Sequence, residues 1–219
     1  MAHIAEDLLL LLLDNESAQP RLPRSTLTRV LAAALLLDLA HDCRVRPAVP
    51  GDAAHPGHLV ALAGPVPLDP AVRPALALLE RGPLTADAAI STLRKRAEDD
   101  VLDQLLRSGQ IHQIQLSSHR LRRNTYAWPM HDRRRIDGIR GAVGAALFGG
   151  RPPQPATAAI IALLHTIGGL GAALNIDETA LAHAAHRAGE ITFGAWERGP
   201  AAGDVNLAVT AATVLPALG

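Results

Sequence analysis

One stretch of this chain is apolar almost all the way round a helix. Residues 26–41, with Ser25 in front as the expected N-cap, consist mostly of Leu, Ala and Val. A helix without a polar face belongs in the middle of a bundle. Its apolar run stops at Asp38, and the earlier run Leu8–Leu13 stops at Asp14, both far short of the roughly 20 residues that a membrane span needs. We therefore expect a buried central helix and no transmembrane segment.

The composition favours helices elsewhere as well. Hydrophobic residues make up 48% of the chain but aromatic residues only 2%, so the apolar content is aliphatic. Sheet proteins are usually richer in aromatic and β-branched residues. We predict a mainly α fold, in which a helical bundle core is surrounded by amphipathic helices, as a single domain over residues 1–219.

Gly and Pro residues divide the chain into further helices. The segment 46–67 is rich in Pro and Gly, and only His58–Ala63 within it is typical of a strand. The helices that the apolar spacing predicts cover residues 4–14, 26–41, 69–79, 88–96, 98–107, 132–147, 155–167, 177–188 and 204–215.

A single exposed β-hairpin is predicted after the fifth helix. Residues 110–116 form its first strand, and residues 121–128 form a basic return strand. Two helices followed by a hairpin is also the order of a winged helix. Residues 84–128 are therefore a candidate winged-helix-like subdomain.

Positive charge is concentrated around this hairpin. The net charge of the whole chain is zero, but residues 117–140 hold seven Arg against two Asp. Arg binds phosphate oxygens through its planar fork, and Trp and Tyr favour the headgroup level of a membrane. A solvated basic face with Trp128 packed under the hairpin is the alternative interpretation. The residues predicted to contact a membrane are Arg120, Arg122, Arg123, Tyr126 and Trp128.

The candidates for catalysis are few. His183 and His186 are spaced to share a helix face with Glu190, but the H-E-x-x-H order of zinc proteases is absent. Gly168–Gly171 lacks the Lys-Ser/Thr of a phosphate-binding loop. We predict no catalytic residue, no cofactor and no metal site. Cys43 is the lone cysteine and there is no signal-peptide pattern. We therefore expect a cytoplasmic protein, either free or attached to the membrane surface.

Several motifs follow one another along nearly the whole chain. They are the acidic-then-leucine start Ile4–Leu11, Leu36–Ala40 followed by Cys43–Val45, Pro67–Pro70, Leu93–Ile111 and Thr157–His165. In these motifs and their order the chain resembles the Golgi phosphoprotein 3 family. The abundance of Arg over the lone Lys95 indicates a bacterial member with a GC-rich genome.

This resemblance implies a mainly helical domain with an exposed hairpin and no catalytic activity. Eukaryotic relatives bind phosphatidylinositol 4-phosphate on Golgi membranes and the tails of glycosyltransferases, and they use the hairpin to contact the membrane or to self-associate. The expected partners are therefore an anionic phospholipid headgroup or membrane surface, a protein partner, and a second copy of the chain through the hairpin.

The resemblance also implies where a lipid phosphate would bind. Relatives use a Trp ahead of the core helix, an Arg inside it and two Arg in an L-R-x-x-R stretch. Pro23 and Ala32 occupy the first two positions, and the second Arg of the pair falls on Ala97 or Glu98. We predict a residual lipid or anion site, with nearby arginines replacing the lost groups in part. Its residues are Arg21, Arg24, Arg29, Arg94 and Lys95.

The alternative function is a winged-helix-type DNA-binding regulatory protein. In that fold the second helix enters the DNA major groove. Here that helix carries four carboxylates, which oppose the phosphate attraction that dominates DNA affinity. Nucleic acid is therefore the disfavoured partner. The four residues are Glu98, Asp99, Asp100 and Asp103.

Overall fold

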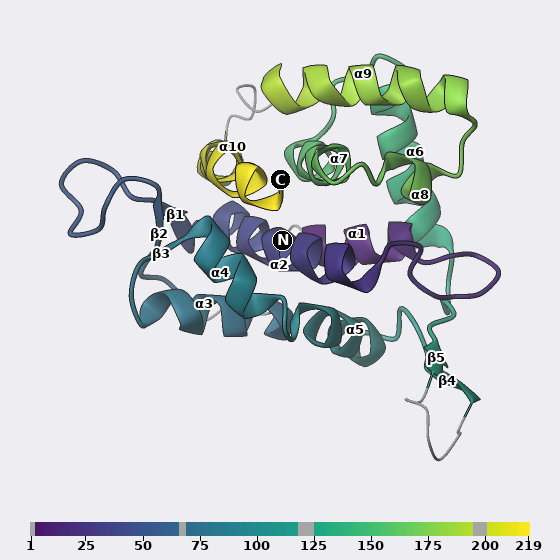
Figure 1. Ribbon diagram of the computed structural model, residues 1–219, viewed down its shortest axis with the longest axis horizontal. Coiled ribbons are helices and arrows are strands. Elements are labelled where there is room, and N and C mark those ends of the chain that lie inside the picture. Colours follow the sequence, from purple (N-terminus) through teal and green to yellow (C-terminus); the bar gives the residue numbers. More distant parts are fainter. Residues whose placement is uncertain (1–2, 66–68, 118–124, 195–200) are drawn as a thin grey trace.

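The structure, a computed structural model, describes residues 3–65, 69–117, 125–194 and 201–219. Two helices, α1 (Ile4–Leu12) and α2 (Arg24–His41), lie in the middle of the molecule. Figure 1 shows α7, α9 and α10 on one side of this pair and α3, α4 and α5 on the other. No helix in the described ranges has both the length and the apolar character needed to cross a membrane.

The mainly helical prediction is confirmed. The remaining α-helices are α3 (Arg73–Glu80), α4 (Ala86–Leu93), α5 (Ala97–Arg107), α6 (Arg134–Leu147), α7 (Pro155–Thr166), α8 (Leu170–Leu174), α9 (Glu178–Gly194) and α10 (Ala202–Val214). Short 3-10 turns are η1 (Pro70–Val72) and η3 (Leu215–Leu218). The strands are β1 (Val45–Pro47), β2 (His58–Ala61), β3 (Leu84–Thr85), β4 (Ile114–Ser117) and β5 (Thr125–Ala127).

The predicted central helix is confirmed in α2. Every residue from Val30 to Ala40 is buried, and α1, α5 and α10 pack around the helix. Three consecutive alanines, Ala32–Ala34, are fully buried in its middle. Small side chains at these positions let the neighbouring helices approach closely, which is why an all-round apolar helix can be covered on several sides.

One charged residue of α2 is buried with this apolar surface. The Asp38 carboxylate accepts hydrogen bonds from the backbone amides of Ile4 at 2.7 Å and Ala5 at 3.0 Å. No side chain of the adjoining segment caps α1, so Asp38 satisfies amides that would otherwise be buried without partners. Burial raises the pKa of Asp38 well above its usual range, against the lowering effect of the two amides.

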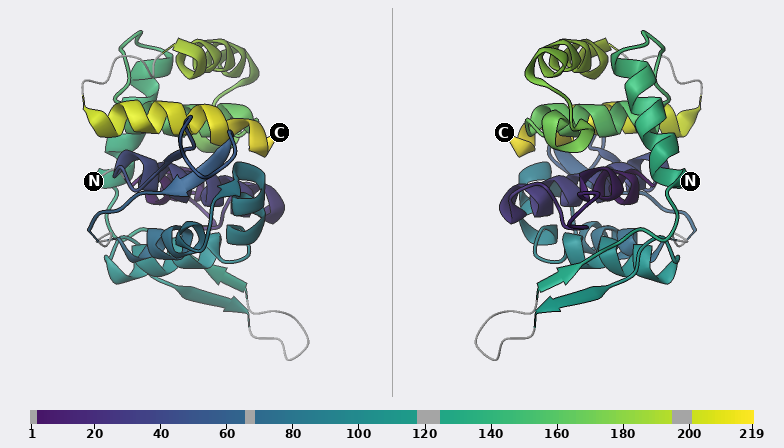
Figure 2. Two further views of the ribbon diagram at one scale, coloured as in Figure 1. Left: turned by 90° about the vertical axis from the view of Figure 1, so that its left-hand side faces the viewer. Right: turned by 90° about the vertical axis from the view of Figure 1, so that its right-hand side faces the viewer.

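Two small antiparallel sheets complete the fold. Strand β2 pairs with β1 on one side and β3 on the other, with Val45 opposite Ala61 and Leu59 opposite Leu84. Strands β4 and β5 form the predicted hairpin, which Figure 2 shows extending away from the helices. Its β4 side chains Ile114 and Leu116 are 43% and 54% exposed.

Some local predictions need correction. Helix α2 begins at Arg24 with Pro23 at its N-cap position, so Ser25 lies inside the first turn and is not the cap. Strands β1 and β3 and the short helix α8 were not predicted, because two to five residues are too few to display a period. Strand β3 pairs with β2, outside the segment 84–128, and division of the chain into domains stays a prediction.

Candidate functional site

The start of α2 forms one wall of a surface groove of about 390 Å³. The turn between α4 and α5 forms the other wall. Three of the five basic residues predicted for an anion site, Arg24, Arg94 and Lys95, line this groove together with Ser25, Thr28, Glu98 and Asp99. Residues 70 positions apart in the sequence therefore meet here.

Arg94 and Lys95 are the free cations of the groove. Both side chains are exposed, and neither makes an ion pair or a side-chain hydrogen bond with any residue in the described ranges. They follow directly after α4, where Arg94 is the C-cap residue. Because these two cations have no partner among the residues that the structure describes, an arriving anion need not displace one.

Arg24 is already held by an acidic neighbour. Its Nε lies 2.9 Å from Oε2 of Glu98, and the two side chains are 65% and 16% exposed. Glu98 is also one of the two positions onto which the second family Arg falls, so this pair puts a carboxylate where relatives carry a cation. The other position, Ala97, is completely buried and does not reach the groove.

The first turn of α2 adds a second source of positive potential. Pro23 offers no side-chain hydrogen bond to the amides of this turn, and the N-terminal end of a helix carries a partial positive charge. Ser25 and Thr28 line the groove. Helix starts with free amides are common places for phosphate to bind.

The two other predicted basic residues lie apart from this groove. Arg29 lines a neighbouring groove of about 280 Å³ on the other side of Ser25, and it donates to the carbonyl of Ala217 at 2.9 Å. Arg21 is held by Asp14, at 2.8 Å from Nε and 2.5 Å from Nη2. The Ser17 amide and Arg21 hold the pKa of Asp14 well below its usual range. The Arg21 guanidinium is therefore already paired with Asp14, in the loop before α2.

The family positions Pro23 and Ala32 differ in their surroundings. Pro23 is exposed at the start of α2. Ala32 is fully buried in the helix, so neither this side chain nor its position has access to the groove surface. An Arg at position 32 would require different packing around α2.

A larger groove of about 610 Å³ continues from the first and shares Arg24, Glu98 and Asp99 with it. Leu22, Leu27 and Leu102 line it. It ends at Tyr126 and Trp128, whose rings lie 6.0 Å apart. This groove could not be predicted from the sequence, because its walls come from three separate segments and no local pattern marks it.

Tyr126 and Trp128 lie at the end of the hairpin that adjoins the helices. The Trp128 amide donates to the carbonyl of Ala18 at 2.7 Å, and the Gln19 side chain donates to the carbonyl of Tyr126 at 3.1 Å. Trp128 is half-buried against the core, as in the alternative interpretation of this residue. The remaining predicted membrane contacts, Arg120, Arg122 and Arg123, lie outside the described residues.

Part of the basic segment after the hairpin is neutralised. Arg135 bonds to Glu6 and Asp7, and Arg134 pairs with Asp132. These contacts reduce the charge that the seven arginines of residues 117–140 can offer to an outside ligand. The histidines considered for zinc are exposed or stacked, with His183 against Phe148 and His186 near Glu190.

The protein is thus of the mainly helical class, with a basic surface groove at the start of its central helix and a projecting hairpin. The chain belongs to the Golgi phosphoprotein 3 (GPP34) family, whose sequence pattern matches residues 4–212. The predicted resemblance is confirmed by this match. A comparison with curated proteins found no match.

Proposed function

We propose that this chain is a non-enzymatic peripheral membrane adaptor whose groove binds the phosphate of an anionic lipid headgroup, with a phosphatidylinositol 4-phosphate-like headgroup as the preferred ligand. The observation that carries the proposal is the pair of exposed cations Arg94 and Lys95, which have no partner in the described ranges and line the groove opposite the first turn of α2. Membership of the Golgi phosphoprotein 3 family supports the same ligand class.

The charges of the groove set the expected strength of binding. Each basic residue near an anionic membrane contributes about 1 kcal/mol. Glu98 and Asp99 lie in the same groove and offset part of that attraction. We therefore expect weaker binding than in a relative with four phosphate ligands, and a strong dependence on salt, because exposed charges are screened over about 10 Å at 0.1 M ionic strength.

The test is co-sedimentation with phosphatidylcholine vesicles that contain phosphatidylinositol 4-phosphate, phosphatidylinositol or phosphatidylglycerol, at low and physiological salt. The variant Arg94→Glu/Lys95→Glu should weaken binding about 30-fold or more, since two contributions of about 1 kcal/mol are lost. The matched control is Arg96→Glu. Arg96 follows in the same turn, is 75% exposed and pairs with Asp100 rather than lining the groove.

The outcomes separate the parts of the proposal. Binding selective for phosphatidylinositol 4-phosphate and lost in the double variant alone supports the groove as a headgroup site. Equal weakening by Arg96→Glu leaves only a general electrostatic attraction. If the double variant binds vesicles as the parent does, the groove is not the headgroup site. A nonspecific DNA duplex serves as a further control, and tighter binding to DNA than to any vesicle would favour the winged-helix alternative.

We further propose that the hairpin supplies a second membrane contact, as its basic sequence predicts. The variant Arg120→Glu/Arg122→Glu/Arg123→Glu should weaken binding to all anionic vesicles alike, because these residues would contribute charge without headgroup selectivity. Vesicle binding unchanged in this triple variant would remove the hairpin from the proposal and leave the groove untouched.

A further inference from the structure

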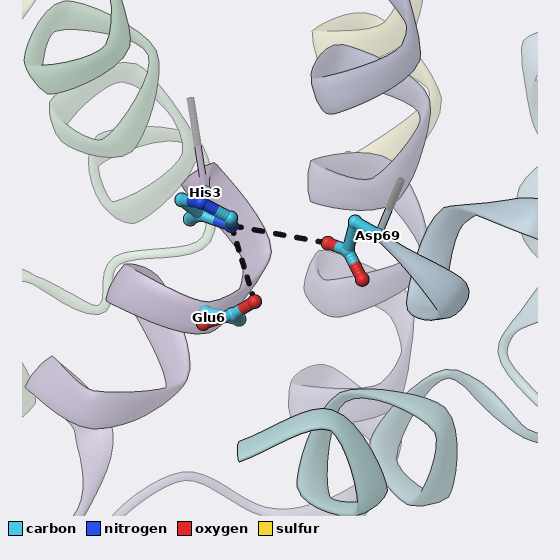
Figure 3. Close-up of side chains that lie close together, drawn as sticks. All are labelled: His3, Glu6 and Asp69. Atoms are coloured by element: carbon cyan, nitrogen blue, oxygen red, sulfur yellow. Dashed lines mark ion pairs between the residues drawn. The ribbon is translucent and has the colours of Figure 1, made fainter. Parts of the chain in front are cut away.

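Three side chains that can bind a metal ion meet at the beginning of α1. His3 is the N-cap residue of the helix, Glu6 lies in its first turn, and Asp69 precedes η1. Figure 3 shows the His3 ring with one ion-pair contact to each of the two carboxylates. Nδ1 of His3 lies 3.1 Å from Oε1 of Glu6 and 3.9 Å from Oδ2 of Asp69. The three potential ligand atoms all lie within 4.8 Å of one another.

Two of these atoms are buried, and neither has a hydrogen-bond partner outside this group among the described residues. Glu6 is only 3% exposed, and its Oε1 makes no hydrogen bond with any described residue. Nδ1 of His3 is likewise a buried atom without a hydrogen bond to any described residue. When His3 is neutral and Nδ1 carries its lone pair, two acceptors face each other at 3.1 Å. Buried polar atoms of this kind need a partner, and a cation or a proton between them would supply it.

The other oxygen of each carboxylate is held in place by the protein. Oε2 of Glu6 accepts a hydrogen bond from Nη1 of Arg135 at 2.7 Å, and Oδ1 of Asp69 accepts one from the amide of Ala71 at 2.8 Å. Each carboxylate is therefore fixed through one oxygen and presents the other to His3. Metal sites are commonly built in this way, with outer contacts that orient the ligand groups.

The surrounding charge also favours a cation. Glu6, Asp69, Asp38 and Asp7 all lie around this point, and Arg135 is the guanidinium that pairs with two of them. Glu6, Asp38 and Asp69 are all buried, and a bound dication would offset the cost of burying their negative charge.

We propose that His3, Glu6 and Asp69 form a binding site for a divalent transition-metal ion of the Zn²⁺ type. One imidazole nitrogen and two carboxylate oxygens suit Zn²⁺, whereas Mg²⁺ and Ca²⁺ prefer oxygen ligands alone. Bonds of about 2.0 Å to a tetrahedral ion place ligand atoms about 3.3 Å apart, close to the 3.1 Å between His3 and Glu6. His3 is 39% exposed, which leaves a side open for water as the fourth ligand.

The site joins segments that are far apart in the sequence and lies away from the proposed lipid groove. A metal ion bound there would link the beginning of α1 to the segment before α3, next to Asp38 near the end of α2. The groove is at the first turn of α2, about 20 Å away along that helix at 1.5 Å per residue. No metal site was expected from the sequence, because His3, Glu6 and Asp69 do not have the spacing of a known metal-binding motif.

The test uses the full chain without a histidine tag, freed of metal by dialysis against a chelator. We expect Zn²⁺ titration calorimetry to show one equivalent bound, and Co²⁺ to give the visible absorption of a tetrahedral site. At a free Zn²⁺ concentration about 100 times its Kd, the unfolding temperature should rise by about 5 °C or more.

Two variants test the ligands. His3→Gln and Asp69→Asn should each weaken Zn²⁺ binding about tenfold or more, and the Asn keeps an oxygen to accept from the Ala71 amide. His186→Gln is the control, since His186 is 78% exposed beside Glu190 and should bind Zn²⁺ like the parent. Absence of Co²⁺ absorption in the parent chain, or equal Zn²⁺ affinity of the parent and His3→Gln, would overturn the proposal.

Discussion

Asp38 shows how a single residue can determine the position of a helix. Its carboxylate accepts from the amides of Ile4 and Ala5 across 34 and 33 residues of sequence. Side-chain caps usually come from the residue next to the helix. Here the residue next to the helix, His3, makes no cap, and the cap comes from the neighbouring helix. The same contact therefore fixes α1 against α2.

We expect Asp38→Ala to lower the free energy of unfolding by about 2 kcal/mol, because two buried amides lose their acceptors. Asp38→Asn should cost less, since its amide oxygen can still accept one bond. Urea denaturation followed by circular dichroism measures both. Asp42→Ala, at the C-cap of α2, is the control and should change stability by about 0.5 kcal/mol or less. Equal effects of Asp38→Ala and Asp42→Ala would contradict this role.

At the scale of elements, α6 is attached to α1 by one arginine. Arg135 lies 2.7 Å from Glu6 through Nη1 and 2.6 Å from Asp7 through Nη2. Its side chain is 26% exposed, while that of Glu6 is 3% exposed. The charges of Glu6 and Arg135 are thus largely removed from water, so loss of Arg135 leaves the buried Glu6 with His3 as its remaining basic neighbour among the described residues.

Arg135→Ala should therefore destabilise the protein by about 3 kcal/mol, the cost typical of breaking a buried ion pair. Arg134 is the matched control, because it is adjacent and also pairs with a carboxylate, but its side chain is 92% exposed. Exposed pairs contribute little, so Arg134→Ala should change the stability by about 0.5 kcal/mol at most. Chemical denaturation of both variants checks the difference, and similar midpoints would contradict the attachment.

At the scale of the whole molecule, α10 closes the helical assembly over α2. The Asn206 side chain donates to the carbonyls of Ala40 at 2.6 Å and Val45 at 2.7 Å. Gly203 lies so near the end of α2 that a Cβ there would overlap the carbonyl oxygen of His41. The C-terminal helix thus approaches the central helix more closely than a larger residue would allow.

Gly203→Ala should destabilise the protein by about 1 to 3 kcal/mol, because α10 must shift to relieve the overlap. Gly141→Ala is the opposite control. Gly141 is exposed within α6, and its Cβ would meet no atom within 4 Å, so Ala should stabilise that helix by up to about 1 kcal/mol. Thermal unfolding of the two variants should move in opposite directions, and a shift of both in the same direction would count against the close approach.

Local pattern explains what could be predicted. The all-round apolar character of residues 26–41 indicated the central helix, and Gly and Pro marked the helix ends, because helix period and chain reversal depend on near neighbours. The order of motifs indicated the family. Arg94 and Lys95 were predicted for the anion site through that resemblance, and both line the groove.

Tertiary structure decided which side chains meet. No spacing in the sequence shows that Glu98 pairs with Arg24, that Arg21 is taken up by Asp14, or that Asp69 lies beside His3. The sequence by itself determined the longer helices, because their periodicity is local. The partners of each charge, and with them the free cations of the groove and the grouping of His3, Glu6 and Asp69, depend on how those helices pack.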